Sequence, residues 1–330
     1  AAYITRTGDP DVIEYGDLPE PEPGSGQVLV RTEAVAVNPI DTYVRGGLVS
    51  IELDYPYTIG CDLAGVVEAC GEGVDRFTVG DRVWGSNQGL LGRAGTFSEL
   101  AAVDQQWLYG APDGVSSELL AAGALVGLTA HLGLFLHAGV AGDDLVFVNG
   151  GTGGVGAAVV QLAKGAGARV AATVGSTEKQ EICRSLGADL VVDYHDPDMD
   201  QILAEFAAEN GGIDVWFETL REPTPERTIE LMAKRGRIVL MAGRAARPEF
   251  PVGPFYKKDL RLFGFAMFNA SADEQRVCGE RINELAAAGG WNPPIGARFP
   301  LSDSVAAHQL QQDNTIGGLG TLAGKIVLTP

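Results

Sequence analysis

The chain has 330 residues, 45% of them hydrophobic, a length and composition that suit roughly two globular domains. Its net charge of −19 repels phosphate backbones and anionic lipids, which argues against binding to nucleic acid or to membranes. We recognise no signal peptide, and the four cysteines are scattered, so we expect a cytoplasmic protein with reduced thiols.

Residues 1 to about 115 contain short apolar runs bounded by glycine, proline or aspartate, a pattern typical of a small β-barrel. The expected strands are 28–37, 65–69, 82–84 and 97–102. The segments 38–49 and 55–62 are rich in polar and aromatic groups, and we expect them to be loops.

From about residue 116, helices alternate with apolar strands. Strands are expected at 145–149, 169–174, 190–193, 213–218, 236–242 and 260–265. The helices are expected at 117–137, 155–165, 177–186, 198–209 and 224–234. Glycines and two histidines interrupt the most apolar stretch, 121–138, so we expect a buried helix there and not a membrane span. This alternation indicates a doubly wound parallel sheet with right-handed crossovers.

The last fifty or so residues leave this alternation. Helices are expected at 273–288 and 302–312, and strands at 296–300 and 325–329, which we expect to return to the first domain. The predicted fold is therefore α/β, with a barrel domain of residues 1–118 and 270–330 and a parallel-sheet domain of residues 119–269.

A glycine-rich turn follows the strand at 145–149. It contains the pattern G-x-G-x-x-G as Gly151, Gly153 and Gly156, and a helix is expected directly after it. The order strand, glycine turn, helix is that of a dinucleotide-binding site, in which bare backbone and a helix N-terminus hold the pyrophosphate. The alternative is an ordinary glycine-rich turn between a strand and a helix.

The second strand of this domain ends without the acidic residue that binds the ribose of NADH. Gly175 stands there, and Ser176, Thr177 and Lys179 follow, which can supply hydrogen-bond donors and a positive charge for a 2′-phosphate. Tyr194, after the third strand, could cover the adenosine. We therefore predict NADPH in preference to NADH, with a solvated helix residue as the alternative interpretation of Lys179.

No metal site is expected. Cys61 and Asp62 form the only pair that could begin one, no histidine stands near them in sequence, and no cysteine cluster exists. A G-x-S-x-G turn for nucleophilic chemistry is also absent from the sequence. Without a Lewis acid, acceptors that take a hydride by conjugation become the more plausible substrates.

Several motifs resemble one known family. They are VNPIDTYVRGG at 37–47, YTIGCDLAGVV at 57–67, VGDRV at 79–83, GLTA at 127–130, the glycine run at 150–156, GGID at 211–214 and AGK at 323–325. Over nearly its whole length the chain resembles the zinc-free quinone oxidoreductases, the zeta-crystallin-like group of the medium-chain dehydrogenase/reductase superfamily.

The resemblance implies a GroES-like β-barrel catalytic domain, a Rossmann domain that binds NADPH, and a homodimer or tetramer. Asn38 and Cys61 stand where zinc-containing relatives have a cysteine and a histidine ligand. The cofactor contacts that the resemblance implies are Asn38, Thr129, Gly151, Gly153, Gly154, Val155, Gly156, Gly175, Ser176, Lys179, Tyr194, Gly243, Arg244, Phe268 and Lys325.

Hydride transfer needs positioning, a dry site and stabilisation of charge on the acceptor oxygen. Tyr43 is the candidate hydrogen-bond donor to that oxygen, with Asn38 and Asp41 on the same segment as the other candidate catalytic residues. Phenol hydroxyls donate well but are poor acids near neutral pH, so we expect Tyr43 to position substrate. The alternatives are that Tyr43 only lines the cleft and that Asp41 only orients its loop or caps a turn.

Three functions remain open from the sequence. The first is NADPH-dependent reduction of a quinone, and the second is reduction of the C=C bond of an α,β-unsaturated carbonyl compound. The third is a non-catalytic NADPH-binding sensor or structural protein.

Overall fold

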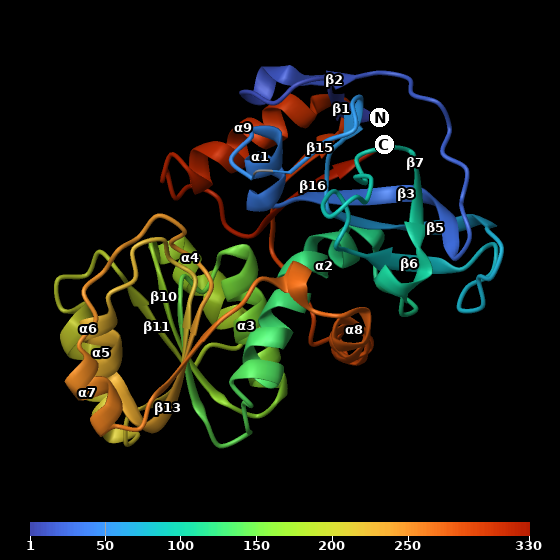
Figure 1. Cartoon of the computed structure of the whole chain (residues 1–330). Coiled ribbons are helices and arrows are strands. Elements are labelled where there is room, and N and C mark those ends of the chain that lie inside the picture. The colour runs from blue at the N-terminus through green and yellow to red at the C-terminus, as the bar shows by residue number, and fades with distance from the viewer. Residues whose placement is uncertain (50) are drawn as a thin grey trace. The chain divides into compact units, whose positions relative to one another are not determined.

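The computed structural model describes residues 1–49 and 51–330, which form two compact units. Unit 1 contains residues 1–125 and 271–330, and unit 2 contains residues 126–270. The division lies within helix α2 (Ser117–His131), and the last helices and strands of the chain belong to the same unit as the first ones (Figure 1).

Unit 1 is built around the long strand β3 (Gln27–Val37), which pairs with β5, β7 and β16. Its larger sheet has the order β15-β16-β3-β5-β6-β8, and a smaller one has the order β2-β1-β4. The other strands are β1 (Ala2–Ile4), β2 (Ile13–Tyr15), β4 (Tyr57–Thr58), β5 (Asp62–Cys70), β6 (Arg82–Gly85), β7 (Leu100–Asp104), β8 (Leu108–Gly110), β15 (Ile295–Pro300) and β16 (Lys325–Thr329).

The C-terminal segment completes unit 1. Strand β16 pairs antiparallel with β3, and β15 pairs parallel with β16. Helix α8 (Ala272–Ala287) begins at a capping box formed by Ser271 and Glu274, and α9 (Ser304–Thr315) follows β15. A Cβ atom at Gly279 of α8 would lie 2.5 Å from the Tyr109 ring, so only glycine allows this close approach to β8.

The expectation of a loop over residues 38–49 is wrong, because α1 (Pro39–Arg45) is a helix. Its first residues explain this. Asn38 is the N-cap, Pro39 occupies the first helical position, and the Asp41 carboxylate accepts a hydrogen bond from the Asn38 backbone N–H at 2.7 Å. The apolar periodicity of a single seven-residue helix was too short to predict it.

Unit 2 contains a six-stranded, entirely parallel sheet with the order β11-β10-β9-β12-β13-β14, which confirms the doubly wound fold. The strands are β9 (Leu145–Asn149), β10 (Arg169–Val174), β11 (Leu190–Asp193), β12 (Ile213–Glu218), β13 (Met232–Leu240) and β14 (Arg261–Gly264). The helices are α3 (Gly154–Gly165), α4 (Thr177–Ser185), α5 (Met199–Glu209), α6 (Pro225–Leu231) and α7 (Val252–Lys257).

Apolar side chains of these strands and of α5 and α6 form the core of unit 2, in which the Phe147 and Trp216 rings lie 4.1 Å apart between centroids and are tilted by 38°. Helix α6 ends earlier than predicted, because β13 already begins at Met232, which pairs with Ile213. Helix α2 continues into the π-helical turn Leu132–His137. By length and composition Ser117–His137 could cross a membrane, but 78% of its most apolar window is buried inside the protein, as expected for a core helix.

Candidate functional site

The glycine turn between β9 and α3 has the geometry of a phosphate site. Gly150 adopts a φ of +88°, and a Cβ atom at Gly156 would lie 2.0 Å from the Gly150 carbonyl oxygen. Gly151 is also closely packed, because a Cβ atom there would lie 2.7 Å from the Ala172 side chain and from the Cys183 sulfur. Glycine at these positions lets the turn pack tightly between strand and helix.

The second glycine of the pattern has a different role. Gly153 is the exposed N-cap of α3, and a Cβ atom there would contact nothing closer than 3.5 Å. No side chain caps this helix, so the N–H groups of Gly154, Val155 and Gly156 face away from any intrahelical acceptor. This end of α3 fits a pyrophosphate.

The adenosine side of the predicted site lies at the ends of β10 and β11. A Cβ atom at Gly175 would lie 2.2 Å from the Tyr194 hydroxyl, so the tyrosine lies directly against this glycine. Ser176 caps α4, and its hydroxyl accepts a hydrogen bond from the Lys179 N–H at 3.3 Å. Lys179 is half-buried, and burial lowers the pKa of its ammonium group.

The structure therefore brings Gly175, Ser176, Lys179 and Tyr194 together. Asp193 pairs in register with Val174 at the end of β10, but its carboxylate accepts a hydrogen bond from the His195 N–H at 2.9 Å. The other predicted cofactor residues of unit 2 are not part of the contacts around Gly175 and Tyr194. Thr129 is buried on α2, Gly243 and Arg244 follow β13, and Phe268 lies in the 3-10 turn Met267–Asn269.

The remaining predicted residues belong to unit 1, where Asn38 and Lys325 are part of one buried polar cluster. The Asn38 amide donates to Asp62 Oδ2 at 2.7 Å, and the Lys325 ammonium donates to Asn38 Oδ1 and to the Val37 carbonyl. Lys325 Nζ lies 4.0 Å from Asp62, and Ser86 donates to the same carboxylate at 2.6 Å. Asp62 and Ser86 were not predicted as site residues, because their roles depend on strands that are distant in sequence.

Asp41 and Cys61 adjoin this cluster, and the Cys61 thiol donates a hydrogen bond to the Asp41 carboxylate. Burial raises the pKa of Asp41 to about 7 and raises the pKa of the Cys61 thiol well above its usual range. Burial also raises the pKa of Asp62 and lowers that of Lys325, while the attraction between these two groups acts in the opposite sense on each. Tyr43 is half-buried on the same short helix as Asp41.

Within residues 1–49 and 51–330, no three histidine, cysteine or acidic side chains are grouped so that they could hold a metal ion. From the sequence resemblance, Asn38 and Cys61 are expected at the positions that ligate zinc in zinc-containing relatives. Both lie in a cluster that already contains the Lys325 ammonium group, whose charge opposes that of a second cation.

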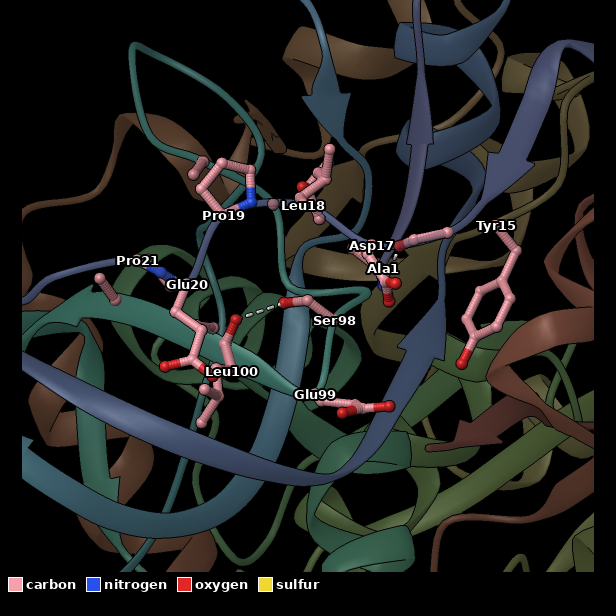
Figure 2. Close-up of a pocket in the computed structure, with 16 residues that line it drawn as sticks. Ala1, Tyr15, Asp17, Leu18, Pro19, Glu20, Pro21, Ser98, Glu99 and Leu100 are labelled. Carbon is pink, nitrogen blue, oxygen red and sulfur yellow. Dashed lines mark hydrogen bonds between the residues drawn. The ribbon is translucent and has the colours of Figure 1, made fainter.

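A surface cavity of about 410 Å³ lies elsewhere on unit 1, beside the N-terminal residue (Figure 2). Asp17, Glu20 and Glu99 line it, and none of the predicted site residues does. Its acidic lining is unsuited to a phosphorylated ligand, so we do not include it in the candidate site.

Asp41→Asn tests the buried carboxyl group. The folded-state pKa of Asp41 is raised to about 7 from an ordinary value of 3.8, so its contribution to stability is complete below pH 3.8 and is lost as the pH rises to 7. The variant retains an oxygen acceptor for the Asn38 N–H but does not ionise. We expect its stability relative to that of the wild type to rise by about 1.4 kcal/mol per pH unit between pH 3.8 and pH 7, and to stay constant above pH 7. Urea unfolding at each pH measures this, and a difference independent of pH contradicts it.

Two protein-family models match the chain. The model described as alcohol dehydrogenase GroES-like domain matches residues 24–113, and the one described as zinc-binding dehydrogenase matches residues 154–282. Human quinone oxidoreductase is 30% identical over 329 residues, which cover 99% of this chain and 97% of the human protein.

Two solved structures share the fold. A mycobacterial protein complexed with NADPH is 30% identical with a TM-score of 0.83, and an NAD-dependent alcohol dehydrogenase is 30% identical with a TM-score of 0.86. Both comparisons cover 100% of this chain and 99% of the other. Because the identity to human quinone oxidoreductase extends over almost the entire length of both proteins, the chain belongs to the quinone oxidoreductase family of the medium-chain dehydrogenase/reductase superfamily.

Proposed function

We propose that this protein is an NADPH-dependent oxidoreductase that reduces quinones without a metal ion. The observation that carries the proposal is the end of β10, where Gly175 follows the strand in place of an acidic residue and Ser176, Lys179 and Tyr194 lie beside it. The quinone oxidoreductase activity of the human relative and the NADPH bound to the mycobacterial structure support it.

NADPH, when bound, supplies the hydride, and the residues of the chain bind and orient it. The N–H groups at the start of α3 hold the pyrophosphate, and Ser176 and Lys179 donate to the 2′-phosphate. Thr129, Gly243, Arg244 and Phe268 complete the cofactor site of unit 2 in this proposal. A partly buried ammonium group binds a phosphate strongly, because few water molecules screen the two charges.

On the acceptor side, we assign Tyr43 the hydrogen bond to the acceptor oxygen, since its side chain is only half-buried. Asn38 and Asp41 are almost wholly buried and are engaged within the polar cluster. Their proposed role is to position α1 and thereby Tyr43. The Lys325 ammonium group donates a hydrogen bond to Asn38 and lies beside Asp62. It therefore already supplies the positive charge that a metal ion would bring next to this carboxylate, which supports a reaction without a metal.

A homodimer is also proposed, with the edge strand β14 at its interface. Strand β14 ends the sheet of unit 2, and Leu262 on it is 44% exposed. Phe250, Val252 and Tyr256 of the preceding segment are exposed as well. Exposed apolar groups beside an unpaired strand edge are typical of an interface.

Lys179→Ala tests the choice of cofactor. Loss of the ammonium group removes a charged partner of the 2′-phosphate, so the dissociation constant of NADPH rises at least tenfold while that of NADH stays within about twofold. Fluorescence titration with both nucleotides measures this, and Lys257→Ala, an exposed lysine on α7, is the control. An unchanged ratio of the two affinities would exclude Lys179 from the site.

Tyr43→Phe tests the acceptor side. With a 1,4-quinone as acceptor, kcat/KM for NADPH oxidation falls about tenfold, as expected when one hydrogen bond to a developing charge is lost, and NADPH affinity does not change. Tyr15→Phe, which changes an exposed tyrosine of β2 in the same unit, is the control. Activity equal to the wild type would mean that Tyr43 only lines the site.

The same assay separates the other functions. Faster turnover of a 2-alkenal than of any quinone would assign the enzyme to C=C reduction. Tight NADPH binding without turnover of either acceptor would indicate the non-catalytic protein.

Sedimentation equilibrium at micromolar concentration tests the dimer. We expect twice the chain mass of 34.6 kDa for the wild type and a monomer for Leu262→Lys, because a lysine at the edge strand places charge in the apolar interface. Val305→Lys, which changes an exposed apolar residue of unit 1, should remain a dimer. A monomeric wild type refutes the proposal.

A further inference from the structure

Three neighbouring strands of the parallel sheet end in buried polar side chains directly beneath the glycine turn. Thr173 stands near the end of β10, Asn149 ends β9 and Glu218 ends β12, and at most 3% of each residue is exposed. Strand β9 lies between the other two, and Glu218 pairs in register with Asn149. Apolar residues occupy most of the remaining strand positions, so this polar group at the carboxyl edge requires an explanation.

The polar groups that contact the Glu218 carboxyl oxygens are all hydrogen-bond donors. Asn149 Nδ2 lies 3.2 Å from both of its oxygens, Trp216 Nε1 donates to Oε2 at 3.1 Å, and the Leu220 N–H donates to Oε1 at 2.9 Å. Only an ionised carboxylate accepts at both oxygens without presenting a proton of its own. The contacts therefore match the charged form of Glu218, although burial raises the pKa of this group.

The orientation of each following group is then determined in turn. Because the Asn149 amide nitrogen faces Glu218, its carbonyl oxygen Oδ1 faces Thr173 and accepts the hydroxyl hydrogen of that threonine. The Thr173 oxygen is left with its lone pairs, and it accepts a hydrogen bond from the Gly150 N–H at 3.2 Å. The chain of hydrogen bonds thus runs from Glu218 through Asn149 and Thr173 to the first glycine of the turn.

Further bonds hold the turn on both sides of β9. The Gly151 N–H donates to the Thr173 carbonyl oxygen at 2.8 Å, and the Thr219 hydroxyl donates to the Asn149 carbonyl oxygen. The Gly150 carbonyl oxygen in turn accepts from the Gly153 N–H at 3.1 Å, which connects the chain of bonds to the N-cap of α3.

We propose that Glu218 is a positioning residue for the pyrophosphate of the cofactor. Through Asn149 and Thr173, its ionised carboxylate orients Gly150 and so sets the direction of the N–H groups at the start of α3. This inference rests on the proposed binding of a nicotinamide dinucleotide to unit 2.

Two nearly isosteric changes interrupt the chain at different links. Glu218→Gln introduces an amide NH2 group among donors, so at least one of them loses its acceptor and the Asn149 amide is no longer oriented. Thr173→Val removes the acceptor of the Gly150 N–H and leaves the shape of the side chain almost unchanged. Glu218→Asp keeps the charge on a shorter side chain and should restore part of the affinity that Glu218→Gln loses.

Calorimetric titration with two ligands tests the proposal. NADPH contains the pyrophosphate, whereas adenosine 2′-monophosphate contains only the 2′-phosphate end. We expect the dissociation constant of NADPH to rise roughly tenfold in Glu218→Gln and in Thr173→Val, and that of adenosine 2′-monophosphate to stay within about twofold. Glu205→Gln, on the exposed face of α5, is the matched control and should bind both ligands like the wild type.

Wild-type affinity for NADPH in both variants would overturn the proposal, and so would an equal loss for both ligands, which would show only a damaged fold. A wild-type protein that binds NADH but not NADPH would refute the proposed cofactor. The proposal for Glu218 would then still predict weaker binding of NADH to the same variants, because NADH has the same pyrophosphate. A wild-type protein that binds neither nucleotide would refute both proposals.

Discussion

A buried carboxylate at the carboxyl edge of the parallel sheet connects the core of unit 2 to its surface turn. Glu218 is surrounded by donors, and the bonds that follow from it orient Asn149, Thr173 and finally Gly150. A turn composed mostly of glycine has little intrinsic conformational preference, because glycine tolerates many backbone angles. Here the hydrogen bonds from the strands beneath it select one conformation. The cost of burying a charge is offset by full hydrogen bonding of its oxygens.

Unit 1 also contains a buried, hydrogen-bonded polar cluster, and this one holds distant segments of the chain together. Its polar cluster joins three segments of the chain, because Lys325 comes from the last strand, Asn38 from the N-cap of α1 and Asp62 from β5. The pair formed by Lys325 and Asp62 is nearly inaccessible to water. Removal of either partner would leave an uncompensated buried charge, which makes such a cluster a strong constraint on how the two ends of the chain fold together.

Periodicity predicted the long elements well and the short ones poorly. Strands such as β9 and β10 were predicted with the bounds that the structure has, because buried parallel strands are continuous apolar runs. Helix α1 was missed, although Asn38, Pro39 and Asp41 form a recognisable helix start, because seven residues provide less than two turns of pattern. The early start of β13 at Met232 was missed because pairing with Ile213 overrides the local helical preference.

The sequence by itself determined the parallel sheet, the glycine turn and the absence of an acid at Gly175, since each depends on residues that are neighbours along the chain. It also marked Asn38, Asp41 and Tyr43 as one segment. Only the tertiary structure decided that Asn38 is bonded to Asp62, that Lys325 lies beside Asp62, and that Glu218 lies beneath the glycine turn. These are contacts between strands that pack side by side but are distant in sequence, and no local pattern encodes their register.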